Sequence, residues 1–99
     1  MKVANLSQLK KALAAGHDFK IIEHFKKPEH TGEIRHVSKM QTNGFYSVIK
    51  DDPESPVSKA NRGLGYWLDF GKAADWLFTE KAGDVYTCTL AGVFEIEIL

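Results

Sequence analysis

The sequence has a single cysteine, Cys88, and therefore cannot form a disulfide within the chain, which fits a reducing cytoplasm. It also lacks any apolar run near the roughly 18 residues that a membrane span needs. Polar residues interrupt the first 16 residues, where a signal peptide would be continuously apolar. We therefore expect a soluble, cytoplasmic protein that makes no contact with a membrane.

Motifs for catalysis and cofactor binding are also missing. The chain contains no GxGxxG, phosphate loop, HExxH or cysteine pair. His24, His30 and His36 are six residues apart, which matches no zinc-ligand spacing, so we expect surface histidines and no metal or cofactor. Cys88 has no histidine near it in sequence, and we expect it to be a buried structural residue. These absences predict that the protein is not an enzyme.

The formal net charge is zero, but the charges are unevenly distributed along the chain. Residues 1–50 have nine Lys or Arg and four acids, whereas residues 51–99 have four Lys or Arg and nine acids. The two halves either form separate basic and acidic surfaces or attract each other as their strands interleave, and we favour the second interpretation. A nucleic-acid-binding domain is usually basic overall, which argues against that function for the whole chain.

The beginning of the chain has the pattern of an amphipathic helix. Leu6, Leu9 and Leu13 recur at helical spacing, so they predict one apolar stripe. Asn5 is a good N-cap residue, and Gly16 is a typical C-terminal stop.

Three strand-like runs follow. In Phe19–Lys26, alternation places Phe19, Ile21 and Phe25 on one side of a strand. Glu33–Gln41 and Phe45–Lys50 flank an Asn-Gly pair, which predicts a hairpin with a tight primed turn. The alternation within Glu33–Gln41 is irregular, which indicates either a β-bulge or a strand exposed to water on both faces.

The second half begins with a loop and an aromatic stretch. Residues 51–65 contain two prolines and many turn-forming residues, which favours a long loop. Residues 66–70 alternate as a strand, and Asp69 is placed to cap a following helical turn whose inward residues would be Ala73, Ala74 and Leu77. Most of the aromatic rings are expected in the core. Trp67 is the exception, and we favour its packing beneath the 51–64 loop over exposure.

The last two strands are predicted at Val85–Leu90 and Val93–Leu99, joined at Ala91-Gly92. In the final strand, Phe94, Ile96 and Ile98 should face inward. This strand is a candidate sheet edge, and self-association through Val93–Leu99 follows as a prediction.

Together these elements predict one domain, residues 1–99, of the α+β class. An N-terminal helix packs on a curled antiparallel sheet of five or six short strands, and closure into an SH3-like barrel is left open.

Part of this pattern resembles small uncharacterised proteins of bacteriophages and prophages of Gram-positive bacteria. The residues that carry the resemblance are Gly32, Arg35, Val37, Gln41–Phe45 and Trp67–Phe70, about a third of the chain. The resemblance implies a phage accessory role and supplies no catalytic residue.

The leading hypothesis is a non-enzymatic binding module that contacts another protein. The alternative is a nucleic-acid-binding small β-barrel that uses a basic face and stacking rings. A third hypothesis, a small hydrolase or metal enzyme built on the histidines, requires convergent ligands that the sequence does not indicate. The candidate binding residues are Lys20, Lys26, Lys27, Arg35, Lys39, Tyr46, Arg62 and Trp67.

Overall fold

The computed structural model describes all 99 residues and contains two α-helices, two short 3-10 helices and seven strands. The helices are α1 (Leu6–Ala14) and α2 (Pro56–Gly63), with 3-10 turns η1 (Pro28–His30) and η2 (Ala73–Asp75). The strands are β1 (Phe19–His24), β2 (Ile34–Met40), β3 (Gly44–Ile49), β4 (Tyr66–Asp69), β5 (Trp76–Glu80), β6 (Tyr86–Leu90) and β7 (Phe94–Ile98). The α+β class and the antiparallel sheet are confirmed, but the sheet has seven strands rather than five or six.

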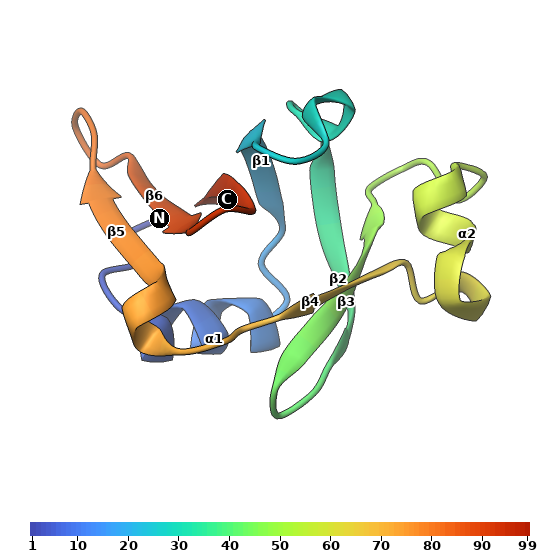
Figure 1. Ribbon diagram of the computed structural model, residues 1–99, viewed down its shortest axis with the longest axis horizontal. Helices are drawn as coiled ribbons and strands as arrows, with labels where there is room; N and C mark the ends of the chain where they lie inside the picture. The colour runs from blue at the N-terminus through green and yellow to red at the C-terminus, as the bar shows by residue number, and fades with distance from the viewer.

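All seven strands belong to one sheet in the order β4-β3-β2-β1-β7-β6-β5. Strands β4 and β5 follow each other in the chain yet lie at opposite ends of that order, and only residues 70–75 connect them. Such a short connection requires the sheet to curl until its two ends approach each other (Figure 1). Because β4 and β5 do not pair, the sheet is an open half-barrel. Neither helix has the length or apolar character of a transmembrane segment.

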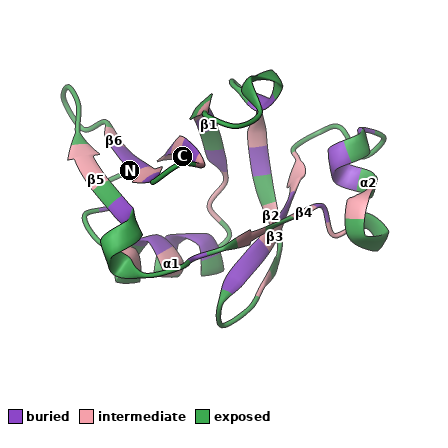
Figure 2. Cartoon of the chain, in the orientation of Figure 1, coloured by how far each residue is buried: buried purple, intermediate pink, exposed green.

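Helix α1 packs its apolar stripe into the hollow of the half-barrel. Leu9, Ala12 and Leu13 are buried within the same core cluster as the inward residues of the strands (Figure 2). The predicted cap is confirmed, since the Asn5 side chain accepts a hydrogen bond from the Gln8 amide at 2.9 Å. The core therefore lies between α1 and the concave face of the sheet.

Strand β1 contains a bulge that the sequence does not predict. The register against β7 shifts between Ile21 and Glu23, which reverses the alternation for the rest of the strand. The prediction that Phe25 faces the core is therefore wrong, since it is 43% exposed. The bulge instead turns His24 inward, where its ring lies 5.8 Å from the ring of Phe94.

The hairpin between β2 and β3 is confirmed, but its turn differs from the expected primed type. Neither Asn43 nor Gly44 has a positive φ. Gly44 is required for another reason: a Cβ there would lie 2.1 Å from the Leu68 carbonyl oxygen and 2.6 Å from the Trp67 ring. The predicted bulge in this hairpin is present, between Val37 and Lys39.

The middle of the chain departs from the prediction in two places. The expected 51–65 loop contains helix α2, where the Ser55 side chain caps the Ser58 amide and Pro56 occupies the first turn. The expected helical turn after Gly71 is a 3-10 turn followed by strand β5, so Ala73, Ala74 and Leu77 are exposed rather than inward.

The aromatic stretch supplies both core and surface. Phe70 and Trp76 are buried, and the Trp76 indole donates a hydrogen bond to the Phe70 carbonyl at 2.8 Å. Trp67 is not packed beneath the 51–64 segment as expected. It is 39% exposed and packs against Tyr46, with 5.0 Å between the ring centroids.

The C-terminal hairpin is confirmed, but its last strand is not a sheet edge. Strand β7 pairs with β1 on one side and with β6 on the other. Its inward residues Phe94, Ile96 and Ile98 are buried as predicted. Because β7 has no free edge, the prediction that Val93–Leu99 forms a sheet edge is wrong, and self-association of the chain stays a prediction without that edge to support it.

The charged halves of the sequence remain largely apart in space. Strands β1–β3 of the basic half are adjacent in the sheet, as are β5–β7 of the acidic half. Each ion pair joins two residues of the same half, so no ion pair links them. The ion pairs therefore do not support the expectation that the two halves attract each other through interleaved strands.

Candidate functional site

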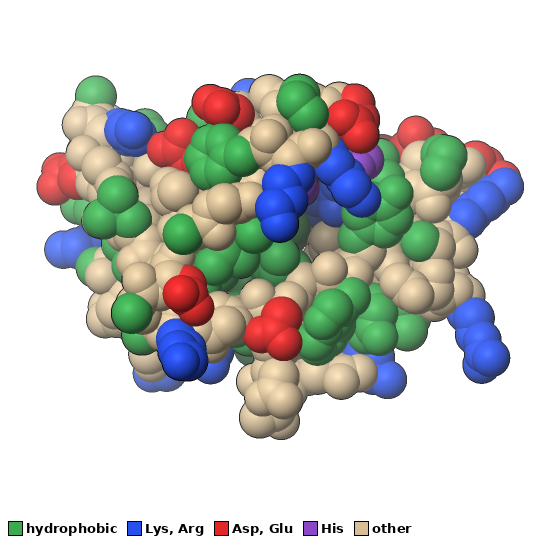
Figure 3. Space-filling view, viewed as in Figure 1, with side chains coloured by type: hydrophobic (Ala, Val, Ile, Leu, Met, Phe, Trp, Pro, Cys, Tyr) green, Lys and Arg blue, Asp and Glu red, His purple; other side chains and the backbone are tan.

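A small pocket opens into the hollow of the half-barrel, with a volume of about 170 Å³. We call it the basic pocket. Figure 3 shows Lys and Arg side chains above a hollow in the centre of this face, with hydrophobic side chains beneath them. The lining residues are Phe19, Ile21, His24, Lys26, Lys27, Arg35, Phe45, Ser47, Tyr66, Trp67, Leu68, Val93 and Phe94.

The floor of the basic pocket is part of the protein core. Phe19 contacts Phe45 edge-to-face at 5.8 Å and Phe94 at 6.4 Å, and all three side chains are buried. Their rings come from β1, β3 and β7, so the curl of the sheet is what brings them together. Because the floor is closely packed, the pocket is preformed in the absence of a ligand.

A buried polar network forms one wall. The Glu33 carboxylate accepts two hydrogen bonds from the Arg35 guanidinium, at 2.7 and 2.9 Å, and contacts His30 Nδ1 at 3.0 Å. Arg35 also donates to the Ser47 hydroxyl at 3.3 Å. The expectation of surface histidines is therefore wrong for His30, which is only 7% exposed. Within this network the charge of Arg35 is balanced by Glu33.

Tyr66 on β4 is held by the same network. The His30 ring packs edge-to-face against the Tyr66 ring at 5.5 Å. The Lys27 ammonium and the Arg35 guanidinium lie over the Tyr66 ring, at 5.1 and 5.6 Å from its centroid. These contacts fix Tyr66 between the η1 segment and β2, at the border of the pocket.

Two lysines at the mouth of the pocket have no acidic partner. Lys26 and Lys27 are exposed, and neither forms an ion pair with a carboxylate. The pKa of the nearby His24 is lowered from its ordinary value, first by burial and then by electrostatic interaction with His30, Arg35 and Lys27, while Glu29 acts in the opposite direction. The mouth of the pocket is therefore electropositive.

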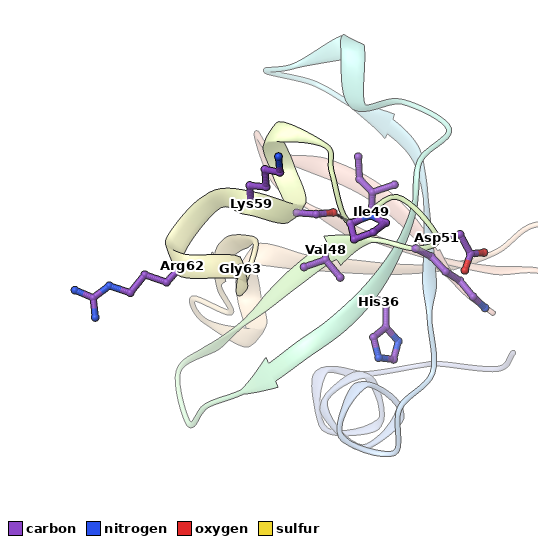
Figure 4. A pocket seen from close by; sticks show the side chains of 10 residues that line it. His36, Val48, Ile49, Asp51, Lys59, Arg62 and Gly63 are labelled. Atoms are coloured by element: carbon purple, nitrogen blue, oxygen red, sulfur yellow. Dashed lines mark hydrogen bonds between the residues drawn. The ribbon is translucent and has the colours of Figure 1, made fainter.

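A second hollow lies on the other face of the sheet, between α2 and strands β2 and β3. We call it the α2 groove. It is larger, about 720 Å³, and open (Figure 4). It is lined by His36, Val48, Ile49, Lys50, Asp51, Pro53, Ser58, Lys59, Arg62 and Gly63.

The cations of the α2 groove are mostly neutralised. Asp18 forms an ion pair with Lys50 and a hydrogen-bond contact with His36 Nδ1, each at 2.6 Å. The pKa of Asp18 is lowered, chiefly by its hydrogen bond to Lys50, and the pKa of Lys50 is raised by the same contact. Lys59 pairs with Glu54 at 2.7 Å, and the Arg62 side chain extends away from the groove in Figure 4.

The structure divides the predicted binding residues between the two faces. Lys26, Lys27 and Arg35 come together in the basic pocket, and Trp67 borders it. On the convex face, the ladder places Lys39 opposite Tyr46 and Tyr46 opposite Trp67. The remaining two residues, Lys20 and Arg62, lie respectively on the exposed side of β1 and beside the α2 groove.

Most residues of the basic pocket and its wall are outside the predicted set, among them His24, His30, Glu33 and Tyr66. The inward position of His24 depends on the β1 bulge, which arises from pairing with β7. The position of Tyr66 depends on the pairing of β4 with β3. The short sequence separation of His24, His30 and Glu33 from Lys27 and Arg35 is a local signal for those three residues, whereas Tyr66 has none.

The other chemical candidates have structural roles. Cys88 is fully buried as predicted, and burial raises the pKa of its thiol to about 12. Asp69 accepts a hydrogen bond from the Gly71 amide at 2.7 Å. The 3-10 turn that follows is instead capped by Asp75, which accepts from the Lys72 amide at 2.8 Å, so the prediction that Asp69 caps this turn is wrong. No group of three or more His, Cys, Asp or Glu side chains is arranged to hold a metal ion.

Comparison with known proteins adds no identification. No protein-family model matches the chain, and neither the curated proteins nor the solved structures gave a match. The functional argument therefore depends on the geometry of the two hollows.

Proposed function

We propose that this protein is a non-enzymatic binding module that holds an acidic segment of a partner protein in the basic pocket. The observation that carries the proposal is that two lysines, Lys26 and Lys27, stand at the mouth of an apolar pocket without a carboxylate partner. A carboxylate that approaches an exposed lysine without an acidic partner is attracted to it. An apolar side chain that covers the pocket floor removes apolar surface from water, which also favours binding.

The basic pocket suits a ligand with two kinds of group. Its volume matches a single apolar or aromatic side chain, which would cover Phe19, Phe45 and Phe94. A neighbouring carboxylate would lie near Lys26 and Lys27. The Glu33–Arg35 network holds the wall in place before binding, so little ordering is required when the ligand enters.

Two further expectations from the sequence remain proposals. A phage or prophage accessory role agrees with a small module that contacts another protein. An SH3-like barrel would require closure of the gap between β4 and β5, which are unpaired in this structure.

Binding of a defined peptide tests the function. The probe is acetylated, amidated Glu-Glu-Phe-Thr-Val-Thr-Phe, together with the same residues in reverse order, measured by calorimetry at low and high salt. We expect salt-sensitive binding by at least one of them. The double variant Lys26→Glu/Lys27→Glu should lower the affinity by about tenfold or more, because four units of charge change at the mouth of the pocket.

The matched control is Lys2→Glu/Lys39→Glu, which makes the same change in net charge at exposed positions outside the pocket. It should leave the affinity within about twofold. A peptide with Lys-Lys in place of Glu-Glu should not bind. Equal losses in the two double variants, or equal binding of the two peptides, would contradict the proposal.

A second candidate function is supported by a separate observation on the convex face. Trp67 and Tyr46 form an exposed aromatic pair with Lys39 adjacent in the ladder, an arrangement that single-stranded nucleic acid can use for stacking and phosphate contact. This candidate predicts low-salt binding of a labelled single-stranded oligonucleotide that is lost in Lys39→Ala and Trp67→Ala. It has less support because Lys26, Lys27 and Arg35 lie on the other side of the sheet.

A further inference from the structure

We propose that the acidic segment binds as an additional β-strand on the free edge of β4, with its inward side chains entering the basic pocket. This inference rests on the proposed function and specifies how the partner is held. Recognition by strand addition takes its affinity from main-chain hydrogen bonds and its specificity from pockets for alternate side chains.

Strand β4 offers the main-chain groups that strand addition needs. It pairs only with β3, so one of its edges is unoccupied. The Phe70 amide donates a hydrogen bond to the Asn43 carbonyl, next to the end of β3. In the register of this ladder, the main-chain groups of Leu68 and Tyr66 therefore also point toward β3. Because bonding alternates along an antiparallel ladder, the amides and carbonyls of Trp67 and Asp69 point away from β3 toward the free edge.

The free edge of β4 lies beside the basic pocket. Tyr66, Trp67 and Leu68 all line that pocket, and the side chains of Tyr66 and Leu68 lie on the same face of the sheet as Phe45 and Ser47. A strand added at the usual spacing of about 4.8 Å would turn alternate side chains toward this face. Those side chains would enter the pocket, and the end of the segment near Tyr66 would meet Lys27.

Charge favours β4 over the other free edge. Strand β5 is also unpaired on one side, and three acids, Asp75, Glu80 and Asp84, lie in or beside it, together with Lys72 and with Lys81, which is already paired with Glu95. The three acids would repel an acidic segment. The Lys26 and Lys27 side chains stand at the mouth of the pocket that β4 borders. Although β4 itself carries Asp69, the two lysines without carboxylate partners make its edge near Tyr66 the better match for an acidic strand.

A second copy of this chain does not supply the strand. The segment with the required alternation of apolar and acidic residues is Val93–Leu99, and its strand β7 is paired on both sides. The partner is therefore a different protein with an extended acidic segment.

N-methylated versions of the binding probe test the inference. In an extended segment, amides of alternate residues point to opposite edges. One version of the peptide carries N-methyl groups on both Thr residues, and the other carries them on Val and the final Phe. Strand addition predicts that one version loses about tenfold or more in affinity, because its edge can no longer bond to β4, whereas the other retains binding.

The outcomes separate the two proposals. Equal affinities of both methylated versions and the parent peptide would overturn strand addition and leave the basic pocket as the binding site. Equal losses in both versions would also overturn it, because a single-edge contact depends on one set of amides. Failure of the parent peptide to bind would overturn the proposed function itself, and binding of the oligonucleotide alone would favour the convex face instead.

Discussion

The basic pocket and the α2 groove both collect cationic side chains, but they differ in what those charges contact. In the groove, Lys50 and His36 share Asp18, and Lys59 pairs with Glu54. In the pocket, Arg35 pairs with Glu33, while Lys26 and Lys27 contact no carboxylate.

The difference shows that the size of a hollow is a poor guide to its use. The α2 groove is about 720 Å³ and the basic pocket about 170 Å³. The larger hollow is open, and its charges are already satisfied within the chain. The smaller one combines free charge with an apolar floor, which are the two features that a ligand can exploit.

The largest expected effect comes from breaking the wall of the basic pocket. Arg35→Ala removes a guanidinium that is 4% exposed and leaves Glu33 without its bidentate partner. We expect a loss of about 3 kcal/mol in the free energy of unfolding, measured by urea denaturation. The corresponding change in the groove, Lys50→Ala, should cost much less because its ion pair is exposed to solvent, which screens the attraction. Similar losses in the two variants would remove the distinction between the hollows.

The next effect concerns binding rather than stability. Lys59→Glu/Arg62→Glu reverses two charges beside the α2 groove and should change the affinity for the acidic peptide by less than about twofold. The same reversal at Lys26 and Lys27 should lower it by about tenfold or more. Calorimetric titration of both variants measures the contrast. A larger loss in the groove variant would place the binding site at α2.

A smaller effect is expected from the groove carboxylate. Asp18→Asn breaks the contacts to Lys50 and His36 and should cost about 1 kcal/mol at neutral pH. The lowered pKa of Asp18 means that this contribution is present above its ordinary value of 3.8 and is lost as the pH falls through its value in the folded protein. The stability difference between wild type and variant should therefore shrink below about pH 4. A difference that stays constant with pH would show that the ion pairs contribute nothing.

The smallest effect is the titration of His24. Its pKa is lowered in the folded protein, so the unfolded chain takes up the proton first and stability falls as the pH drops below 6.5. An acidic segment in the pocket would offset the charges of Lys27 and Arg35 and raise the His24 pKa. Affinity should then increase as the pH falls. NMR titration of the His24 ring with and without the acidic peptide measures the shift, and an unchanged pKa would argue against an anion at the pocket.

Local signals in the sequence predicted the elements better than their arrangement. The Asn5 cap, the two hairpins, the β2 bulge and the burial of Cys88 depend on neighbouring residues and were predicted correctly. Helix α2 was missed although Ser55 and Pro56 carry a start signal, because the many turn-forming residues outweighed it. Residues 72–78 predict a helical turn with Ala73 and Ala74 inward, but the chain forms only the 3-10 turn Ala73–Asp75 before strand β5 begins at Trp76.

The candidate site was predictable in composition but not in geometry. Lys26, Lys27 and Arg35 were named from the sequence, together with residues that lie on the convex face. Which face a residue occupies depends on the bulge in β1 and on the strand order, and both arise from pairing between distant segments. The edges of the sheet are β4 and β5 rather than the predicted β7 for the same reason, since local alternation does not determine which strand is central.

The most direct test is an amide chemical-shift map of the protein with the Glu-Glu-Phe-Thr-Val-Thr-Phe peptide. The account predicts that the largest shifts fall on His24–Lys27 and on β4, with little change around α2 and the end of β3. Shifts concentrated at α2, or confined to Lys39 and Tyr46 on the convex face, would contradict the claim that the free lysines over an apolar floor mark the binding site.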